Sequence, residues 1–204
     1  MPGQSSTPSL PLVVPLPPEV DALRAFEKLC RHPHCLFLDS ALKDAHLGRY
    51  SFVAVDPFDY FTAPADGSDA LELVAQRMRD FSSATVLGLP PFQGGAAGLL
   101  SYDLGRSLER VPRPCFDEFQ SPALAIGLYD TVLAFDHQQA QGWIISHGWP
   151  ATTSEARRQR AAQRVAEVQS WLRETTQLVP KHSIDALSVS ELAPQYPVSE
   201  LTGL

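Results

Sequence analysis

An apolar run near the middle of this 204-residue chain, residues 124–135, most restricts how the chain can fold. A polar turn follows at 138–141, and residues 142–146 return as a second apolar run. Branched and aromatic side chains favour strands, and two such runs joined by a few polar residues predict a β-hairpin with a longer loop. Because the two strands of a hairpin run in opposite directions, this segment favours an antiparallel sheet.

Further strands are predicted before this hairpin. Residues 12–16 fit a short edge strand, where prolines are tolerated. A buried strand is expected at 35–39, and another at 50–55 ends at Asp56 and Pro57. Residues 97–102 read as an apolar strand, and 104–108 as a short helix.

Two segments in the first half of the chain have the spacing of amphipathic helices. The first is expected to begin at Pro18 and to end near His32 and Pro33. Its apolar face is formed by Val20, Leu23, Phe26 and Cys30. The second starts after Asp69, which forms a capping pair with Glu72. Its apolar face is formed by Leu71, Val74, Ala75, Met78 and Phe81.

A third, longer helix is predicted after Thr153 or Ser154, either of which can cap it. Its buried stripe is formed by Ala161, Val165, Val168 and Leu172. The charged residues of this helix are expected mostly on the side that faces water. They are Arg157, Arg158, Arg160, Arg164 and Glu167.

The order of these elements favours an α+β fold with a mostly antiparallel β-sheet core flanked by helices. Strands dominate the middle of the chain, and the helices stand between or outside them. We expect a mobile N-terminus over 1–11, one folded domain over 12–180, and a polar tail over 181–204.

Composition excludes several functions. The net charge of −7 is unsuited to nucleic acid, which requires a basic face, and to an anionic membrane surface. The N-terminal apolar stretch is short and broken by prolines, so we expect neither a signal peptide nor a membrane span. Three cysteines without a CxxC motif predict no disulfide framework, but reduced, mostly buried thiols of a cytoplasmic protein. They are Cys30, Cys35 and Cys115.

A search for catalytic motifs yields no candidate. His32 and His34 flank a proline, and we expect a solvated loop there in preference to a metal site. Ser101 lacks the first glycine of a nucleophile elbow. The glycines at 94, 95 and 98 match no phosphate-binding loop and predict a tight turn with close backbone approach. The residues alone therefore predict a folded α+β domain without a catalytic group.

Three segments nevertheless match one family in order and spacing. The first reads Leu-Phe-Leu-Asp-Ser-Ala at 36–41 and Gly-Arg-Tyr-Ser-Phe at 48–52. The second, at 91–106, reads Pro-Phe-Gln-Gly-Gly-Ala-Ala-Gly-Leu-Leu-Ser-Tyr-Asp-Leu-Gly-Arg. The third reads Gly-Leu-Tyr-Asp at 127–130 and Phe-Asp-His at 135–137. Together they resemble the N-terminal region of the large subunits of anthranilate synthase and aminodeoxychorismate synthase (component I), and the forms found here are closer to the latter.

The resemblance implies a tryptophan-binding pocket. By motif, the contacting positions are Ser40, Leu47, Gly48, Arg49 and Tyr50. A hydroxyl can bond the polar end of the ligand, a glycine permits close approach, and a tyrosine ring can face an indole. The alternative is that Ser40 and Arg49 only tie a loop to a strand. This chain has Leu-Asp-Ser where anthranilate synthases tend to have Leu-Glu-Ser, which puts tryptophan feedback in doubt.

The same resemblance implies that the chemistry lies elsewhere. The chorismate site, its magnesium-binding glutamates and a lysine belong to the C-terminal half of such subunits, and their motifs do not occur in this sequence. We therefore expect no cofactor in this chain, and Mg²⁺ only in a full-length enzyme. Residues 181–204 resemble the connector to that half. The implied partners are a chorismate-binding C-terminal half and a glutamine amidotransferase. The alternatives are a stand-alone tryptophan-binding or assembly module, and the N-terminal part of an anthranilate synthase.

Overall fold

The computed structural model describes residues 10–40, 48–81, 83–112 and 119–174. The predicted connector at 181–204, the end of the predicted domain at 175–180 and most of the predicted mobile N-terminus lie outside these ranges. Within them, no helix is both long and apolar enough to pass through a lipid bilayer.

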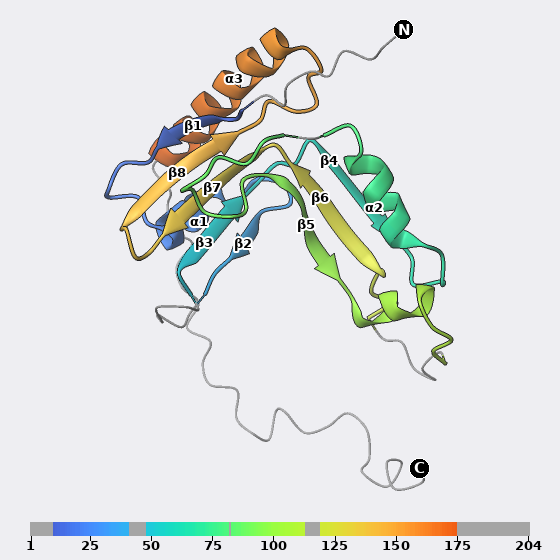
Figure 1. Cartoon of the computed structure of the whole chain (residues 1–204). Helices are drawn as coiled ribbons and strands as arrows, with labels where there is room; N and C mark the ends of the chain where they lie inside the picture. Colours follow the sequence, from blue (N-terminus) through green and yellow to red (C-terminus); the bar gives the residue numbers. More distant parts are fainter. Residues whose placement is uncertain (1–9, 41–47, 82, 113–118, 175–204) are drawn as a thin grey trace, which may run out of the picture. The chain divides into compact units, whose positions relative to one another are not determined.

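The described chain forms two antiparallel sheets (Figure 1), and this confirms the predicted α+β fold. Sheet A has five strands in the order β1-β8-β7-β3-β2. Their bounds are β1 Leu12–Pro15, β8 Gln141–Ser146, β7 Thr131–Asp136, β3 Tyr50–Ala54 and β2 Leu36–Leu38. Sheet B has three strands in the order β4-β6-β5. Their bounds are β4 Asp59–Ala63, β6 Leu124–Tyr129 and β5 Gly95–Leu100.

In the described residues, three α-helices cover these sheets. Helices α1 (Ala22–Leu29) and α3 (Ser154–Arg173) pack on sheet A, and α2 (Ala70–Met78) packs on sheet B. A short 3-10 helix, η1 (Tyr102–Ser107), follows β5 close to the predicted 104–108. The core under α1 and α3 includes Val53, Leu133 and Val168, all almost fully buried. This apolar burial supplies most of the force that holds the layers together.

The long run at 124–135 is two strands and not one. β6 and β7 are separated by Asp130 alone and lie in different sheets. A single strand of this length would exceed the usual strand, and at Asp130 the chain leaves sheet B and enters sheet A. The predicted hairpin is confirmed, because β7 pairs with β8 and Thr131 lies opposite Ser146.

The start and the buried face of α1 differ from the prediction. The helix begins at Ala22, four residues after Pro18, because the Asp21 carboxylate accepts a hydrogen bond from the Arg24 N–H at 2.8 Å. Such a side-chain cap satisfies one of the free backbone N–H groups of the first turn and so marks where the helix begins. The buried residues of α1 are Ala22, Ala25 and Leu29, whereas Leu23 is exposed.

The starts of the other two helices are as predicted. Asp69 caps α2 by accepting from the Glu72 N–H at 3.0 Å, and Thr153 caps α3 by accepting from the Ala156 N–H at 3.2 Å. The predicted buried stripe of α3 is confirmed at all four positions. Arg164 was predicted on the wet side and is instead buried, since its guanidinium bonds Asp56 and Glu167.

Three smaller predictions need correction. β2 is an edge strand with an exposed Leu38, so it is not a buried strand. Cys30 is exposed, contrary to the expectation of buried thiols, and Cys35 is half-buried; both are free, and Cys115 lies outside the described residues. β4 was not predicted, because Asp56 and Pro57 end the preceding strand only two residues earlier. Its alternation of buried Phe61 with exposed Tyr60 is nevertheless a strand signal.

Candidate functional site

Most of the predicted ligand residues gather at one end of sheet A. Ser40 follows the end of β2, while Gly48 and Arg49 immediately precede Tyr50, the first residue of β3. β2 pairs with β3 so that Leu38 lies opposite Phe52, and the same register continued brings Ser40 toward Tyr50. Leu47 lies outside the described residues. The structure thus places the four described residues near one another, and the binding of a ligand by them stays a prediction.

The Arg49 side chain forms an ion pair with Asp136, the last residue of β7. Its Nε lies 3.1 Å and its Nη2 2.7 Å from Asp136 Oδ2, so the contact is two-pronged. Burial alone raises the pKa of Asp136, but hydrogen bonds from Arg49, Gln139 and Gln138 outweigh burial, and the net pKa is lowered. The hydrogen bond with Asp136 likewise raises the pKa of Arg49. This contact ties the segment before β3 to β7, as the second interpretation of Arg49 expected.

The backbone and the aromatic groups at this end have defined geometry. Gly48 has a φ of +81°, a conformation that side chains disfavour. The Arg49 guanidinium carbon lies 4.9 Å from the centre of the Tyr50 ring. The rings of Tyr50 and Phe52 are 6.3 Å apart at a tilt of 40°. A flat, apolar surface with a cation beside it is suited to an aromatic ligand.

Sequence reasoning missed three residues that complete this end of sheet A. The hydroxyl of the fully buried Ser51 donates to Asp39 Oδ1 at 2.6 Å and lies 2.6 Å from His137 Nε2. Because its one proton is given to Asp39, the hydroxyl accepts from the Nε2–H of His137. A nucleophilic serine instead gives its proton to the histidine, so this cluster holds strands together and does not activate Ser51. Ser51 and His137 are 86 positions apart, so their contact could not be read from local spacing, although all three residues lie in the segments that carry the resemblance.

A groove of about 520 Å³ adjoins this cluster. One wall comes from the turn between β7 and β8, with Asp136, His137 and Trp143; the other is the Pro-rich segment at 15–18 with the start of α1. Asp136 lines this groove, and its carboxylate also binds Arg49, so the groove lies next to the predicted ligand residues.

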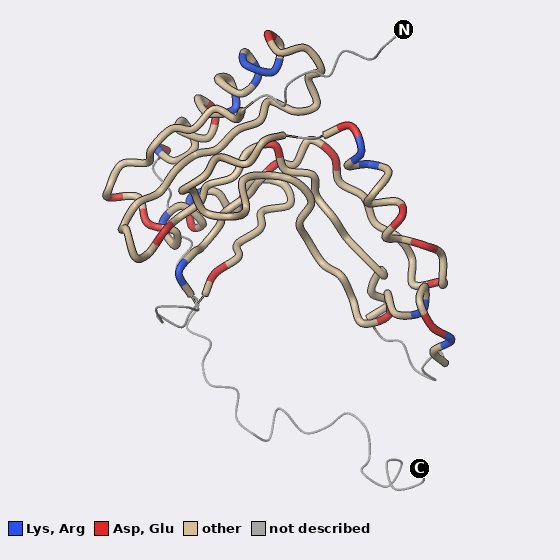
Figure 2. Tube along the Cα trace, viewed as in Figure 1, with Lys and Arg blue, Asp and Glu red and all other residues tan. Residues whose placement is uncertain are grey.

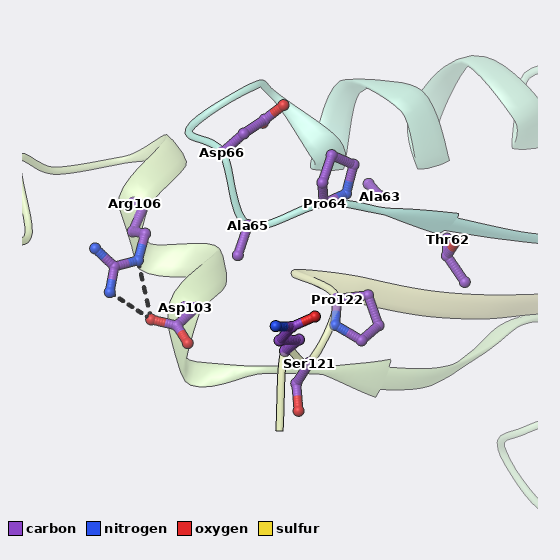
Figure 3. A pocket seen from close by; sticks show the side chains of 10 residues that line it. Thr62, Ala63, Pro64, Ala65, Asp66, Asp103, Arg106, Ser121 and Pro122 are labelled. Atoms are coloured by element: carbon purple, nitrogen blue, oxygen red, sulfur yellow. Dashed lines mark hydrogen bonds and ion pairs between the residues drawn. The ribbon is translucent and has the colours of Figure 1, made fainter. Parts of the chain in front are cut away.

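A second cavity, of about 620 Å³, lies at the end of sheet B (Figure 3). Its charged side chains include Asp103 and Arg106 of η1, which are paired at 2.8 Å on one side of the cavity. Arg106 also donates to the carbonyls of Val111 and Pro112. The Arg106 guanidinium is thus engaged by Asp103 and by two backbone carbonyls. The Tyr-Asp-Leu-Gly-Arg motif therefore has a structural role, because it ties η1 to the segment that follows it.

The Phe-Gln-Gly-Gly motif joins the two sheets. The buried Gln93 side chain donates to the carbonyls of Val86 and Pro90 and accepts from the Val86 N–H. His147 Nε2 lies 2.8 Å from the Gln93 carbonyl, and a Cβ at Gly94 would meet the His147 ring at 2.7 Å. The predicted close approach is therefore confirmed at Gly94, and at Gly98 beside the Ala125 backbone, but at Gly95 the nearest atom is Met78 Cε at 3.7 Å.

No metal site is formed by the part of the chain that the structure describes. It contains no group of three or more His, Cys, Asp or Glu side chains placed to hold an ion. His32 stacks on Trp171 and His34 on Tyr60, so the two histidines have different partners. The described residues therefore do not form a site for the magnesium ion implied for a full-length enzyme, and we assign no chemical step to such an ion in this chain.

The fold and site define an α+β domain whose polar side chains gather at one end of sheet A. The sequence of this domain is similar to known proteins. No family model matches the chain. Anthranilate synthase component 1 of Saccharomyces cerevisiae is 35% identical over 149 residues, which are 70% of this chain. Aminodeoxychorismate synthase component 1 of Bacillus subtilis is 32% identical over 139 residues, or 61% of this chain. The chain is a homologue of these component 1 proteins.

The match spans only part of each relative. It covers 29% of the yeast protein and 29% of the B. subtilis protein. The crystal structure of anthranilate synthase component I from Streptococcus pneumoniae TIGR4 matches 63% of this chain and 33% of its own, with a TM-score of 0.48 and 22% identity.

Proposed function

We propose that this chain is the N-terminal segment of an aminodeoxychorismate synthase component I. The observation that carries the proposal is its identity of 32% to the B. subtilis protein of that name, together with the three motifs in order. The motif residues occupy structural positions: Gln93 and Gly94 join the sheets, Asp103 and Arg106 close η1, and Asp136 holds Arg49.

The whole enzyme would convert chorismate and glutamine to 4-amino-4-deoxychorismate and glutamate, on the route to p-aminobenzoate and folate. An amidotransferase partner would release ammonia from glutamine, and the ammonia would replace the C4 hydroxyl of chorismate with loss of water. The proposal gives the chorismate site and Mg²⁺ to a chorismate-binding polypeptide, and gives this chain a supporting role in the cytoplasm.

Tryptophan is the proposed ligand of the end of sheet A. The Tyr50 ring offers an apolar face, and Gly48 leaves room for close approach. Arg49 would act indirectly by holding Tyr50, because its guanidinium is engaged by Asp136. Ser40 would bond the polar end of the amino acid.

The test is an assay of products. We expect the purified chain, supplied with chorismate, ammonia and Mg²⁺, to form no aminodeoxychorismate. Addition of a chorismate-binding fragment from the B. subtilis relative, with its amidotransferase, should yield aminodeoxychorismate. Product from the chain alone would overturn the proposal that the chemistry lies elsewhere.

Anthranilate synthase is the second candidate, because the yeast enzyme is 35% identical to this chain. The same assay separates the two. Anthranilate as the product of the completed enzyme would place the chain on that branch and would contradict the aminodeoxychorismate assignment.

A further inference from the structure

One arginine of α3 has no acidic partner in the described part of the chain. The N-terminal half of this helix is rich in arginine, as Figure 2 shows. Arg158, Arg160 and Arg164 each form an ion pair with a carboxylate. Arg157 is half-buried and forms no such pair with the described residues, and its Nη2 is buried without a hydrogen-bond partner. Because removal of a charge from water is costly, a half-buried cation normally has an anion beside it.

The Arg157 side chain is held in a fixed place. Its Nε donates to the His147 carbonyl at 3.1 Å, and its guanidinium carbon lies 5.8 Å from the centre of the Trp149 ring. The backbone here is packed tightly, because a Cβ at Gly148 would meet the Arg157 carbonyl oxygen at 2.0 Å. Burial lowers the pKa of Arg157, but a guanidinium stays charged at neutral pH. Arg157 therefore presents an ordered positive charge.

A cavity of about 330 Å³ lies beside Arg157, where the end of β8, the start of β1 and α3 meet. Figure 1 shows β1 next to α3, and the two elements are in contact. Apolar side chains form much of the cavity wall, among them Leu10 and Leu12 at the start of β1 and Ala162 of α3. The volume is at the small end of the range for ligand pockets, so it suits a compact molecule.

The other polar groups around the cavity leave the charge of Arg157 uncompensated. Arg158 also lines the cavity, but a neighbouring glutamate pairs with it. The His147 ring is neutral at neutral pH, because burial lowers its pKa to about 4, and both of its nitrogens already have partners. Residues 1–9 precede the cavity wall in sequence and contain no Asp or Glu.

A ligand that fits this cavity combines an anion with an apolar body. A planar carboxylate matches the N–H groups along one edge of a guanidinium, and such a pair is strong where water is excluded. Water would satisfy a nitrogen of Arg157 but would not balance its charge. Phosphate is less suited, since its further oxygens would face apolar walls without donors. A free amino acid is also less suited, because its ammonium group would lie beside two arginines.

We propose that the cavity between β1, β8 and α3 binds a small molecule that carries a carboxylate on an apolar body, and that the carboxylate pairs with Arg157. The site is separate from the proposed tryptophan site. Gln141 at the start of β8 lies opposite Asp136, whereas Ser146 at the other end of β8 lines the cavity. The inference does not depend on the proposed function.

The experiment measures the binding of benzoate to the purified chain by calorimetry, with benzamide as an uncharged probe of the same shape. We expect benzoate to bind with a Kd of about 1 mM or lower, and benzamide to bind at least about tenfold more weakly. Arg157→Gln should weaken benzoate binding by at least about tenfold, because the charge is lost. Arg173→Gln is the matched control, since Arg173 is exposed at the end of α3 and does not line the cavity.

A second variant fills the cavity without a change of charge. Ala162→Phe places a ring at an exposed position of α3 that lines the cavity, and it should weaken benzoate binding by at least about fivefold. This variant keeps the test decisive if Arg157→Gln does not fold. Tyr50→Ala should bind benzoate as the unaltered chain does. Thermal unfolding without ligand shows which variants are folded.

Other outcomes overturn the proposal. Equal binding of benzoate by Arg157→Gln and the unaltered chain would place the ligand elsewhere. Loss of binding in Tyr50→Ala alone would move the ligand to the end of sheet A. Binding of a peptide with a C-terminal leucine carboxylate, but not of benzoate or hexanoate, would give the site to a chain end of another protein. Binding of none of these probes would leave the cavity without the proposed ligand and Arg157 bonded to water.

Discussion

Single buried polar residues hold the turns and crossings of this domain in place. Asp136 is an example, because its carboxylate binds Arg49 and also accepts from the backbone N–H groups of Gln138 and Gln139 at 3.0 and 3.2 Å. It therefore fixes the β7–β8 turn as well as the segment before β3. His147 has a similar position between Ser83 and Gln93.

Loss of the Asp136 carboxylate should destabilise the domain. We expect Asp136→Ala to lower the free energy of unfolding by about 1–3 kcal/mol, because Arg49 and the two turn N–H groups lose their shared acceptor. Glu155→Ala removes an exposed carboxylate paired with Arg158 and should cost less than about 0.5 kcal/mol. Denaturant unfolding of both variants is the measurement, and an equal effect would contradict the role given to Asp136.

The pH dependence of stability should reflect His147. Burial lowers the pKa of His147 to about 4 from 6.5, while its hydrogen bond to Gln93 raises it and Arg157 lowers it further. A lowered pKa means that the neutral ring favours the folded state. This stability is present above pH 6.5 and is lost as the pH falls toward 4, by up to roughly 3 kcal/mol.

His147→Gln tests this expectation, because glutamine keeps polar groups but does not titrate. Denaturant unfolding at pH 7.5 and pH 4.5 should show a smaller loss for the variant than for the unaltered chain. Equal losses in both proteins would refute the role of His147.

Asp130 acts in the opposite direction. Burial raises the pKa of Asp130, whereas Arg164 and Arg160 lower it, so the contribution of Asp130 to stability falls as the pH rises.

At the scale of elements, close approach between strands depends on glycine. Gly98 in β5 has a φ of +155°, and a Cβ there would meet the Ala125 carbonyl oxygen of β6 at 2.1 Å. We expect Gly98→Ala to cost at least about 2 kcal/mol through strain and overpacking. Gly105→Ala in η1 is the matched control, since open space surrounds its Cβ position and it should change stability by less than about 0.5 kcal/mol.

A buried ion pair joins α3 to the crossing between the sheets. Arg164 Nε lies 3.7 Å from Asp130 Oδ1, and both residues are buried. Arg164→Met leaves the Asp130 carboxylate without this partner and should cost about 3–5 kcal/mol. Asp130→Asn together with Arg164→Met should recover part of the loss. A double-mutant cycle by denaturant unfolding measures the coupling, and strict additivity would show that the pair does not interact.

At the scale of the whole molecule, thermal unfolding with and without millimolar tryptophan is the informative measurement. A ligand that binds only the folded state raises the unfolding midpoint. We expect a rise that Tyr50→Ala abolishes and that phenylalanine at Tyr50 retains, because the proposed contact is with the ring. Cooperative unfolding without a shift would mean that the end of sheet A does not bind tryptophan in this chain.

The sequence by itself determined the local structure. Period and capping residues located α2 and α3, because a cap such as Asp69 or Thr153 and its helix are adjacent in sequence. The hairpin of β7 and β8 followed from its turn, and motif order pointed to the component 1 proteins.

Only the tertiary structure decided which long-range partners meet. The split of the run at Asp130, the burial of Arg164 and the contact of Ser51 with Asp39 and His137 depend on residues far apart in the chain. So does the choice of the face of sheet B that packs against α2, since no pattern within one strand says which face receives a helix. Periodicity reports only that a side of an element is apolar, whereas packing of the whole chain determines what that side contacts.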